Sequence, residues 1–320
     1  MTALRRRAYD RISAKVVELD DTMAAEGGRA EPVPDTEDAA SDPRRLGVAT
    51  QERVRLAVHE RVFGAPRDPV KIGRYTVLKR IGQGGMGVVY AAYDTELDRK
   101  VALKLLHGEG GDTGERLTRE AKALAKLSHP SIVAVHEVGV HDGNVFVAME
   151  FVDGETLREH VLRHTLDWRE LVALYVQAGR GLAAAHAAGL VHRDFKPDNA
   201  LVADAGDAGL RVRVLDFGLA RDVGDREAAH PLGSDAAIDR AVELTRTGTL
   251  LGTPAYMAPE QYVGTAVDAY ADQFAFCVSL WEAIYRERPF DDTSVATVAA
   301  AIMSGRRRPP PAGSRVPLAL

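Results

Sequence analysis

His192-Arg193-Asp194-Phe195-Lys196-Pro197-Asp198-Asn199 is the most informative segment of this sequence. Its polar side chains follow an apolar run and crowd into a loop that Pro197 breaks. Asp194 can orient a hydroxyl group and accept its proton, and Lys196 can neutralise a transferring phosphoryl group. Asn199 can supply an oxygen to a hard cation. A solvated charged turn is the alternative interpretation of this stretch taken alone.

A second carboxylate follows a predicted strand downstream of this loop. Residues 211–215 have a strand pattern and lead into Asp216-Phe217-Gly218. Together with Asn199, Asp216 completes a set of oxygen ligands suited to Mg²⁺ that bridges phosphates. As a lone tripeptide, the same residues would be an ordinary turn.

A glycine-rich stretch lies upstream, between two short β-rich runs. It reads Gly82-Gln83-Gly84-Gly85-Met86-Gly87, and Val88 and Val89 follow it. Glycines allow a backbone to approach phosphates closely because they lack a Cβ atom. A dinucleotide site would need a helix at this point, whereas residues 88–90 favour a strand. A plain hairpin turn is the alternative interpretation.

Two charged residues between these motifs are candidates for an ion pair. Lys104 ends an apolar strand, residues 100–104, so its ammonium group can reach a cleft under the glycine stretch. Glu120 lies on the inward face of a predicted helix, residues 117–127, where a charge needs a partner. Lys104 is the natural partner. The alternatives are a solvated lysine and a glutamate that only borders the apolar face.

The remaining pattern predicts an α+β fold in two parts. Helical periodicity dominates after residue 154, and the boundary between the parts is expected at residues 150–154. The other predicted strands span residues 75–78, 132–140 and 145–149, and the longest predicted helices span residues 168–188 and 272–285. A cleft between two such parts is a common ligand site.

Composition excludes several other classes of protein. The 320 residues are 46% hydrophobic and 27% charged, which is typical of a soluble globular chain. A net charge of −5 argues against a nucleic-acid binder. The single Cys277 excludes an intrachain disulfide and fits a reducing cytoplasm. No uncharged apolar run is long enough to predict a membrane segment.

Ala258-Pro259-Glu260 completes a set of motifs that occurs in a fixed order along the chain. It is preceded by the glycine-rich stretch, the lysine at the end of a strand, the glutamate of the helix, the His-Arg-Asp loop and the Asp-Phe-Gly turn. This is the order of motifs in the protein-kinase signature. On these motifs the chain resembles the bacterial eukaryotic-like (Hanks-type) serine/threonine protein kinases. Lys196 and Thr253 resemble the serine/threonine type rather than the tyrosine type.

The resemblance implies an ATP-dependent enzyme with a bilobal protein-kinase fold. It would transfer the ATP γ-phosphate to serine or threonine hydroxyls of protein substrates, with Mg²⁺ as the metal and Mn²⁺ as an alternative ion. Asp194 would align the hydroxyl, Lys196 would meet the phosphoryl group, and Asn199 and Asp216 would bind the metal. Lys104 would hold the α- and β-phosphates and Glu120 would hold Lys104.

The implied organisation has a kinase domain of a small β-rich N-lobe and a larger helical C-lobe. An N-terminal extension, residues 1–71, is expected to be partly disordered, and an Arg/Pro-rich tail spans residues 306–320. The kinase domain between them, residues 72–305, divides into the N-lobe 72–149, the hinge 150–154 and the C-lobe 155–305. The sequence stops at Leu320, where the family continues with further helices, so the C-lobe is expected to be truncated. A cytoplasmic kinase domain is expected, and membrane tethering through a C-terminal part is left open.

The resemblance also implies which residues bind ATP. They are Ile81, Gly82, Gln83, Gly84, Gly85, Met86, Gly87, Val88, Val89, Ala102, Lys104, Met149, Glu150, Val152 and Leu201. Among them, Glu150 and Val152 would hold adenine through hinge backbone groups, with Met149 as gatekeeper. The residues that would stack to align the lobes are Leu124, Val135, His192 and Phe217, and Asp272 would anchor the His-Arg-Asp backbone. Plain core packing is the alternative for the apolar members.

The segment between Asp216 and Glu260 is longer than is usual in the family and carries several threonines. Thr245, Thr247 and Thr249 sit where such segments carry phosphothreonine. A phosphate there could pair with Arg193 and order the segment. We therefore expect activation by autophosphorylation at Thr247 or Thr245, with self-association if it occurs in trans.

Two other functions fit parts of the pattern. A pseudokinase would bind nucleotide and signal by conformation, but every chemical position of the signature is filled. A small-molecule phosphotransferase can share the catalytic aspartates. The Ala258-Pro259-Glu260 motif and the threonine-bearing segment favour a protein substrate instead.

Overall fold

The computed structural model describes residues 69–84, 87–106, 119–217, 254–263, 265–291, 293–314 and 316–317. Predictions for the first 68 residues, for Gly85 and Met86, and for Thr245, Thr247 and Thr249 fall outside these ranges. The chain forms two units. The first holds the described residues up to 106 together with residues 139–146, and the second holds those of 119–138 and from 147 onward. The predicted domain boundaries stay predictions.

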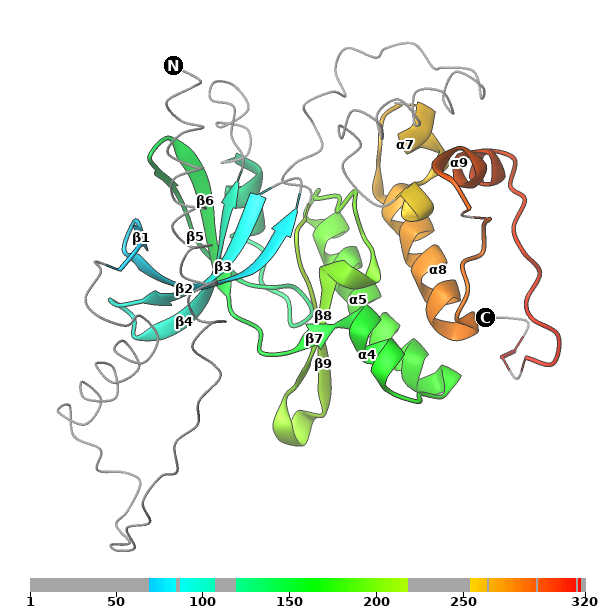
Figure 1. The fold of residues 1–320 in the computed structure, drawn as a ribbon, viewed down its shortest axis with the longest axis horizontal. Helices are drawn as coiled ribbons and strands as arrows, with labels where there is room; N and C mark the ends of the chain where they lie inside the picture. Colours follow the sequence, from blue (N-terminus) through cyan, green and yellow to red (C-terminus); the bar gives the residue numbers. More distant parts are fainter. Residues whose placement is uncertain are drawn as a thin grey trace, which may run out of the picture. The chain divides into compact units, whose positions relative to one another are not determined.

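The first unit is built on antiparallel strands that follow one another along the chain. They are β1 (Lys71–Ile72), β2 (Tyr75–Gly84), β3 (Gly87–Asp94) and β4 (Arg99–Leu106). In the sheet order β1-β2-β3-β4-β6-β5, strands β5 (Val135–His141) and β6 (Asn144–Glu150) enter this unit through residues 139–146 (Figure 1). Tyr75 packs edge-on against Phe146, with ring centroids 5.9 Å apart. Gly139 makes room for that ring, because a Cβ there would lie 2.4 Å from Phe146.

The predicted strands of this unit are confirmed, with two differences at their ends. The strands continue into the glycine-rich stretch, since β2 runs to Gly84 and β3 begins at Gly87. Strand β5 begins at Val135 and not at residue 132 as predicted. The reason is a competing partner, because Ile132 forms a parallel bridge to Val214 and the Val133 amide donates to the Val214 carbonyl at 3.0 Å.

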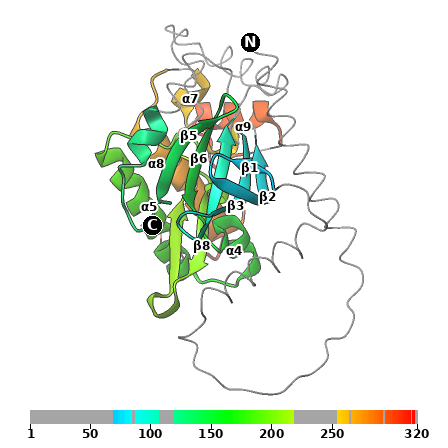
Figure 2. The same cartoon turned by 90° about the vertical axis from the view of Figure 1, so that its left-hand side faces the viewer.

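The second unit is mainly helical. Its helices are residues 119–124, α4 (Leu157–Arg163), α5 (Trp168–Ala187), α7 (Pro259–Val263), α8 (Ala269–Tyr285) and α9 (Val295–Met303), with 3-10 turns η1 (Pro197–Asn199), η2 (Gly206–Ala208) and η3 (Pro254–Tyr256). Helix α5 starts at a capping box. The Asp167 side chain accepts a hydrogen bond from the backbone amide of Glu170, and the Glu170 side chain accepts one from the backbone amide of Asp167. It packs beside α8 (Figures 1 and 2), where the Tyr175 hydroxyl donates to the Ser279 carbonyl at 2.9 Å. The two long helices predicted from periodicity are therefore confirmed.

A small antiparallel sheet lies beside α4 and α5 in the second unit (Figure 1). Its strands are β7 (Glu155–Thr156), β8 (Ala200–Asp204) and β9 (Leu210–Val214), in the order β7-β8-β9. Ala200 pairs with Val214, so the start of β8 and the end of β9 are neighbours. This hairpin brings Asn199, which precedes β8, close to the segment that follows β9. Among the helices of the described residues, none has the length and apolar character needed to span a bilayer.

Candidate active site

Asp272 of α8 anchors the backbone of the His-Arg-Asp loop through hydrogen bonds. Its carboxylate is fully buried and accepts hydrogen bonds of 2.7 Å from the backbone amides of His192 and Arg193. A third contact of 2.7 Å joins it to Nε2 of His186 on α5. Arg193 has a φ of 65°, a conformation that needs such support in a residue other than glycine. The anchoring contact predicted for Asp272 is present.

His192 connects the loop to the strand that leads into Asp216. Its Nε2 donates to the Leu215 carbonyl at 2.7 Å, and its Nδ1 accepts from the Asp194 amide at 3.3 Å. This pair of contacts requires a neutral ring. Burial lowers the pKa of His192, although the nearby carboxylates of Asp272 and Asp194 act in the opposite direction. The His192 ring also packs on Phe217, with centroids 4.8 Å apart.

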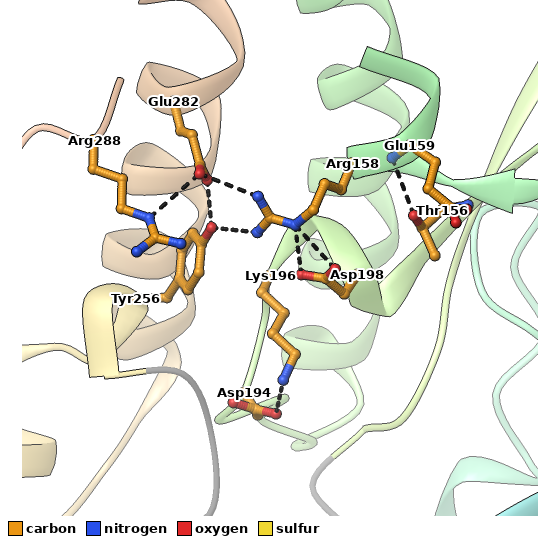
Figure 3. Close-up of polar contacts among 9 residues, drawn as sticks. All are labelled: Thr156, Arg158, Glu159, Asp194, Lys196, Asp198, Tyr256, Glu282 and Arg288. Carbon is orange, nitrogen blue, oxygen red and sulfur yellow. Dashed lines mark hydrogen bonds and ion pairs between the residues drawn. The ribbon is translucent and has the colours of Figure 1, made fainter. Parts of the chain in front are cut away.

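Asp194, Lys196 and Asn199 converge on one point of the loop. Nζ of Lys196 lies 3.3 Å from Oδ2 of Asp194 (Figure 3). The side-chain amide of Asn199 donates to the Asp194 carbonyl at 2.7 Å and lies 3.4 Å from Asp194 Oδ2. The side chains of Asp194 and Lys196 are partly accessible, with exposed fractions of 12% and 19%. An ammonium group and a side-chain amide therefore both contact Asp194, whose carboxylate stays partly accessible.

Asp216 lies next to this cluster because of the β8–β9 hairpin. The Leu215 amide donates to the Asn199 carbonyl at 2.8 Å, which places Asp216 one residue beyond that contact. Asp216 is half-buried and has a φ of 57°. An apolar pocket adjoins it, lined by Leu124, Val133, Val135, Val147, Met149, Val214, Leu215, Asp216 and Phe217. The structure therefore brings together the residues predicted as metal ligands, Asn199 and Asp216, and lines one pocket with three members of the predicted stack.

The predicted hinge residues also belong to the second unit. The Glu150 amide donates to the Ala134 carbonyl at 2.9 Å, and its carboxylate pairs with Arg213 at 3.2 Å. Gly154 is required where the hinge crosses β8, because a Cβ there would lie 2.3 Å from the Val202 carbonyl oxygen. Met149 is buried, and Leu201 is half-buried in β8.

The other predicted nucleotide-binding residues lie in the first unit. Val89 of β3 is paired with Lys104 of β4, and Ala102 lies two residues from Lys104. These three residues therefore share one face of the sheet. Lys104 is 3% exposed, whereas Ile81 is 45% exposed. Glu120 is half-buried and belongs to the second unit, whereas Lys104 belongs to the first. The ion pair expected between them stays a prediction.

An arginine that the sequence analysis missed connects the loop to two helices. Nε of Arg158, on α4, lies 2.9 Å from each carboxylate oxygen of Asp198 (Figure 3). Its guanidinium group also bonds Oε1 of Glu282 at 3.1 Å and the hydroxyl of Tyr256, which in turn donates to Glu282. Arg288 completes the network with a contact of 3.3 Å to Glu282. Three segments distant in sequence, which carry Arg158, Tyr256 and the pair Glu282 and Arg288, are thereby linked to Asp198, the residue that precedes Asn199.

The charges of this network are set by mutual contacts. Burial alone would lower the pKa of Arg158, but the Tyr256 hydroxyl, Glu282 and Asp198 together raise it. Burial and the hydrogen bond to Glu282 raise the pKa of Tyr256 to about 12. Arg158 therefore stays charged and Tyr256 stays protonated at neutral pH.

Helix α4, which carries Arg158, begins at a capping box formed by Thr156 and Glu159. The Thr-x-x-Glu pattern was the sequence signal from which this helix could have been predicted.

The Ala258-Pro259-Glu260 motif is tied to the loop through a neighbouring glutamine. Oε1 of Gln261 accepts from the Ala258 amide at 2.9 Å, and Nε2 of Gln261 donates to the Arg193 carbonyl at 2.9 Å. The motif at the start of α7 is thus held directly against the residue that precedes Asp194. Periodicity gave no sign of this contact, because it joins residues 68 positions apart.

Comparisons with known proteins agree with this arrangement. The family model of the protein kinase domain matches residues 75–310. Curated relatives include the serine/threonine-protein kinase PknA of Mycobacterium tuberculosis, 38% identical over 77% of this chain and 54% of its own length. Another is the serine/threonine-protein kinase pkn2 of Myxococcus xanthus, 36% identical over 71% of this chain and 26% of its own length. The chain thus spans between about a quarter and about half of these relatives.

A solved structure has the same fold. The crystal structure of the Mycobacterium tuberculosis PknI kinase domain is 29% identical in sequence, with a TM-score of 0.53 over 72% of this chain and 82% of that one. The family model covers well over half of the 320 residues. The chain therefore belongs to the protein kinase family.

Proposed function

We propose that this chain is a serine/threonine protein kinase that transfers the γ-phosphoryl group of ATP to hydroxyl groups of proteins. The observation that carries the proposal is the convergence of Asp194, Lys196 and Asn199, with Lys196 Nζ 3.3 Å from Asp194 Oδ2 and the Asn199 amide 2.7 Å from the Asp194 carbonyl. The names of the bacterial relatives support the choice of serine and threonine as acceptors.

Asp194 acts mainly by alignment in this proposal. Its main contribution is a hydrogen bond that points the acceptor hydroxyl along the line of attack. Its carboxylate also takes up the hydroxyl proton as the bond to phosphorus forms. Lys196, beside Asp194, neutralises charge on the moving phosphoryl group. Asp272 accepts hydrogen bonds from the backbone amides of His192 and Arg193 and so anchors the backbone that leads into Asp194.

Asn199 and Asp216 fit the role of metal ligands. The nitrogen of the Asn199 amide is used on the Asp194 carbonyl, so its oxygen is the atom presented to a cation. The Asp216 carboxylate supplies the second oxygen, and oxygen donors are what Mg²⁺ prefers, with Mn²⁺ as an alternative. An ion held by Asn199 and Asp216 would supply positive charge that neutralises the phosphates of ATP.

The residues proposed to bind the nucleotide are found in each of the two units. In the second unit, the Val152 backbone makes no hydrogen bond within the described residues, which leaves its amide and carbonyl for adenine. Met149, Glu150 and Leu201 would surround the base from the same unit. In the first unit, Val89, Ala102 and Lys104 share the face on which the rest of the nucleotide would lie, together with the glycine-rich stretch and Ile81.

We further propose activation by autophosphorylation at Thr247 or Thr245, with Thr249 as a third candidate, by self-association in trans. The support is chemical. Arg193 precedes Asp194 and is held through its amide and its carbonyl, so a phosphate paired with its guanidinium group would be placed against the catalytic loop.

Phosphoryl transfer to a generic protein tests the proposal against its rivals. The purified chain is incubated with ATP labelled in the γ-phosphate, Mg²⁺ and casein, and the label is located by phosphoamino-acid analysis. Phosphoserine or phosphothreonine is expected. Nucleotide binding without transfer would favour the pseudokinase, and label only on added small hydroxyl compounds would favour the small-molecule phosphotransferase.

A further inference from the structure

Three potential metal ligands meet outside the catalytic loop, where β7 passes into α4. Oε1 of Glu155 lies 2.9 Å from Nδ1 of His160 and 3.3 Å from Nε2 of His164. One atom from each of the three side chains lies within 4.8 Å of the other two. The two imidazole rings are 4.4 Å apart and inclined by 35°. The convergence of two imidazoles and a carboxylate on one small volume is the donor set of many zinc sites.

The backbone beneath these side chains is held rigidly by local structure. Glu155 is paired with Val202 in the β7–β8 ladder. The capping box between Thr156 and Glu159 fixes the first turn of α4, directly after Glu155. His160 and His164 are four residues apart, and the His164 amide donates to the His160 carbonyl at 3.1 Å, so both rings project from one face of the helix. A site on such elements needs little ordering when an ion binds.

The spacing of the donor atoms suits a tetrahedral zinc ion. Bonds of roughly 2.0–2.2 Å to nitrogen and oxygen separate neighbouring tetrahedral ligands by about 3.3–3.5 Å. The contacts of 2.9 and 3.3 Å made by Glu155 are already close to that separation. The donor atoms all lie within 4.8 Å of one another, so one ion among them would draw the most distant pair closer, and water can occupy the fourth position. From this geometry we infer that Glu155, His160 and His164 bind one Zn²⁺ ion.

Burial and charge around the cluster agree with this assignment. His160 is 6% exposed, which gives the ion a largely dry inner side, whereas His164 has an exposed fraction of 52% and opens the site to solvent. Within the described residues, Nε2 of His160 has no hydrogen-bond partner, so Nδ1 is the ring atom that determines its orientation. Arg163 pairs with Oε2 of Glu155 at 2.9 Å and leaves Oε1 for the ion. In the absence of metal, Nδ1 of His160 and Nε2 of His164 donate hydrogen bonds to this same Oε1. Zinc binding would replace these two hydrogen bonds with bonds from the ring nitrogens to the ion.

Isothermal titration with zinc chloride tests the inference without nucleotide or Mg²⁺, and therefore independently of the proposed kinase activity. The whole chain, first stripped with a chelator, is expected to bind one equivalent of Zn²⁺ at this site. His164→Ala is the main variant because its side chain is exposed and its loss leaves the fold intact. It is expected to weaken binding by at least about 10-fold, as is Glu155→Gln. The Co²⁺-loaded chain should show the visible absorption of a tetrahedral site, and His164→Ala should abolish it.

His141→Ala is the matched control, because it removes a partly exposed histidine that belongs to the first unit and contributes no atom to the cluster. Its zinc affinity and cobalt spectrum should equal those of the unaltered chain. The inference is overturned if the unaltered chain takes up no stoichiometric zinc. It is equally overturned if the affinity survives both His164→Ala and Glu155→Gln, or if His141→Ala weakens binding to the same extent.

Discussion

Asp272 is fully buried, and both of its carboxylate oxygens accept backbone hydrogen bonds from the His-Arg-Asp loop. In Asp272→Asn, an NH₂ group faces one of the two amide donors, which leaves a buried N–H without an acceptor. We expect the free energy of unfolding to fall by about 1–3 kcal/mol for that group, and phosphoryl transfer to fall because the loop is displaced. Urea unfolding and a transfer assay measure the two effects. Asp207→Asn, the same change at an exposed position, is the control, and equal stability of both variants would contradict the anchoring role.

His192 makes stability depend on pH. Its pKa in the folded chain is lowered by burial, so the unfolded chain binds a proton first as the pH falls. The contribution of His192 to stability is therefore complete above its unfolded pKa, near 6.5, and is lost as the pH falls from there toward its folded pKa. The slope is at most about 1.4 kcal/mol per pH unit. His192→Gln retains a donor toward the Leu215 carbonyl but does not titrate.

Urea unfolding of both proteins between pH 7.5 and pH 5.5 measures this effect by difference, which cancels the other histidines. The unaltered chain should lose more stability than His192→Gln over the interval. Parallel pH profiles would show that His192 is not held neutral by burial.

At the scale of elements, the glycine-rich stretch contains one glycine that is structurally required and another that is not. Gly87 has a φ of +151°, and a Cβ there would lie 2.1 Å from the Leu105 carbonyl oxygen. Gly84 has no atom within 4 Å of a Cβ at its position. Gly87→Ala should therefore force β3 and β4 apart and lower the free energy of unfolding by more than about 2 kcal/mol. Gly84→Ala should be close to neutral by the same urea measurement, and similar losses in the two variants would refute this account of the hairpin.

Local patterns predicted the elements that have strong periodicity or alternation. Helices α5 and α8 and strands β2 to β4 were found in this way, since each buries one regular face or a continuous apolar run. Helix α4 was missed because it has seven residues, too few for a clear period, although Thr156 and Glu159 form a readable capping box. The start of β5 was placed too early because an apolar run does not reveal which partner it pairs with.

At the scale of the whole molecule, motif order predicted the family, but it did not predict the contacts that assemble the site. The Arg158 network joins positions up to 124 residues apart, and no local pattern in the sequence reports such contacts. The loop motif did predict that Asp194, Lys196 and Asn199 would act together, because their spacing is short and a single turn brings them into contact. Contacts of long sequence separation needed the folded structure.

Activation is also a property of the whole molecule, because a phosphate on one segment would act on the loop. Thr245→Ala/Thr247→Ala should lower the rate of phosphoryl transfer and remove most of the label that the chain incorporates into itself. Thr293→Ala, the same change at an exposed threonine outside this segment, is the control. Full activity in the double variant would refute the proposed switch, and mixing an active chain with an inactive one would show whether labelling occurs in trans.

Phosphoryl transfer by Asp194→Asn tests the proposed mechanism most directly. The variant keeps the size of the side chain and removes the charge that aligns and deprotonates the hydroxyl, while the metal and nucleotide ligands stay in place. We predict that label transfer to casein falls by about 100-fold or more, and that ATP affinity, measured by titration calorimetry, is unchanged. Asp207→Asn should transfer label at the rate of the unaltered chain. Equal rates in the Asp194→Asn variant and the unaltered chain would contradict the role of Asp194 and the proposed mechanism with it.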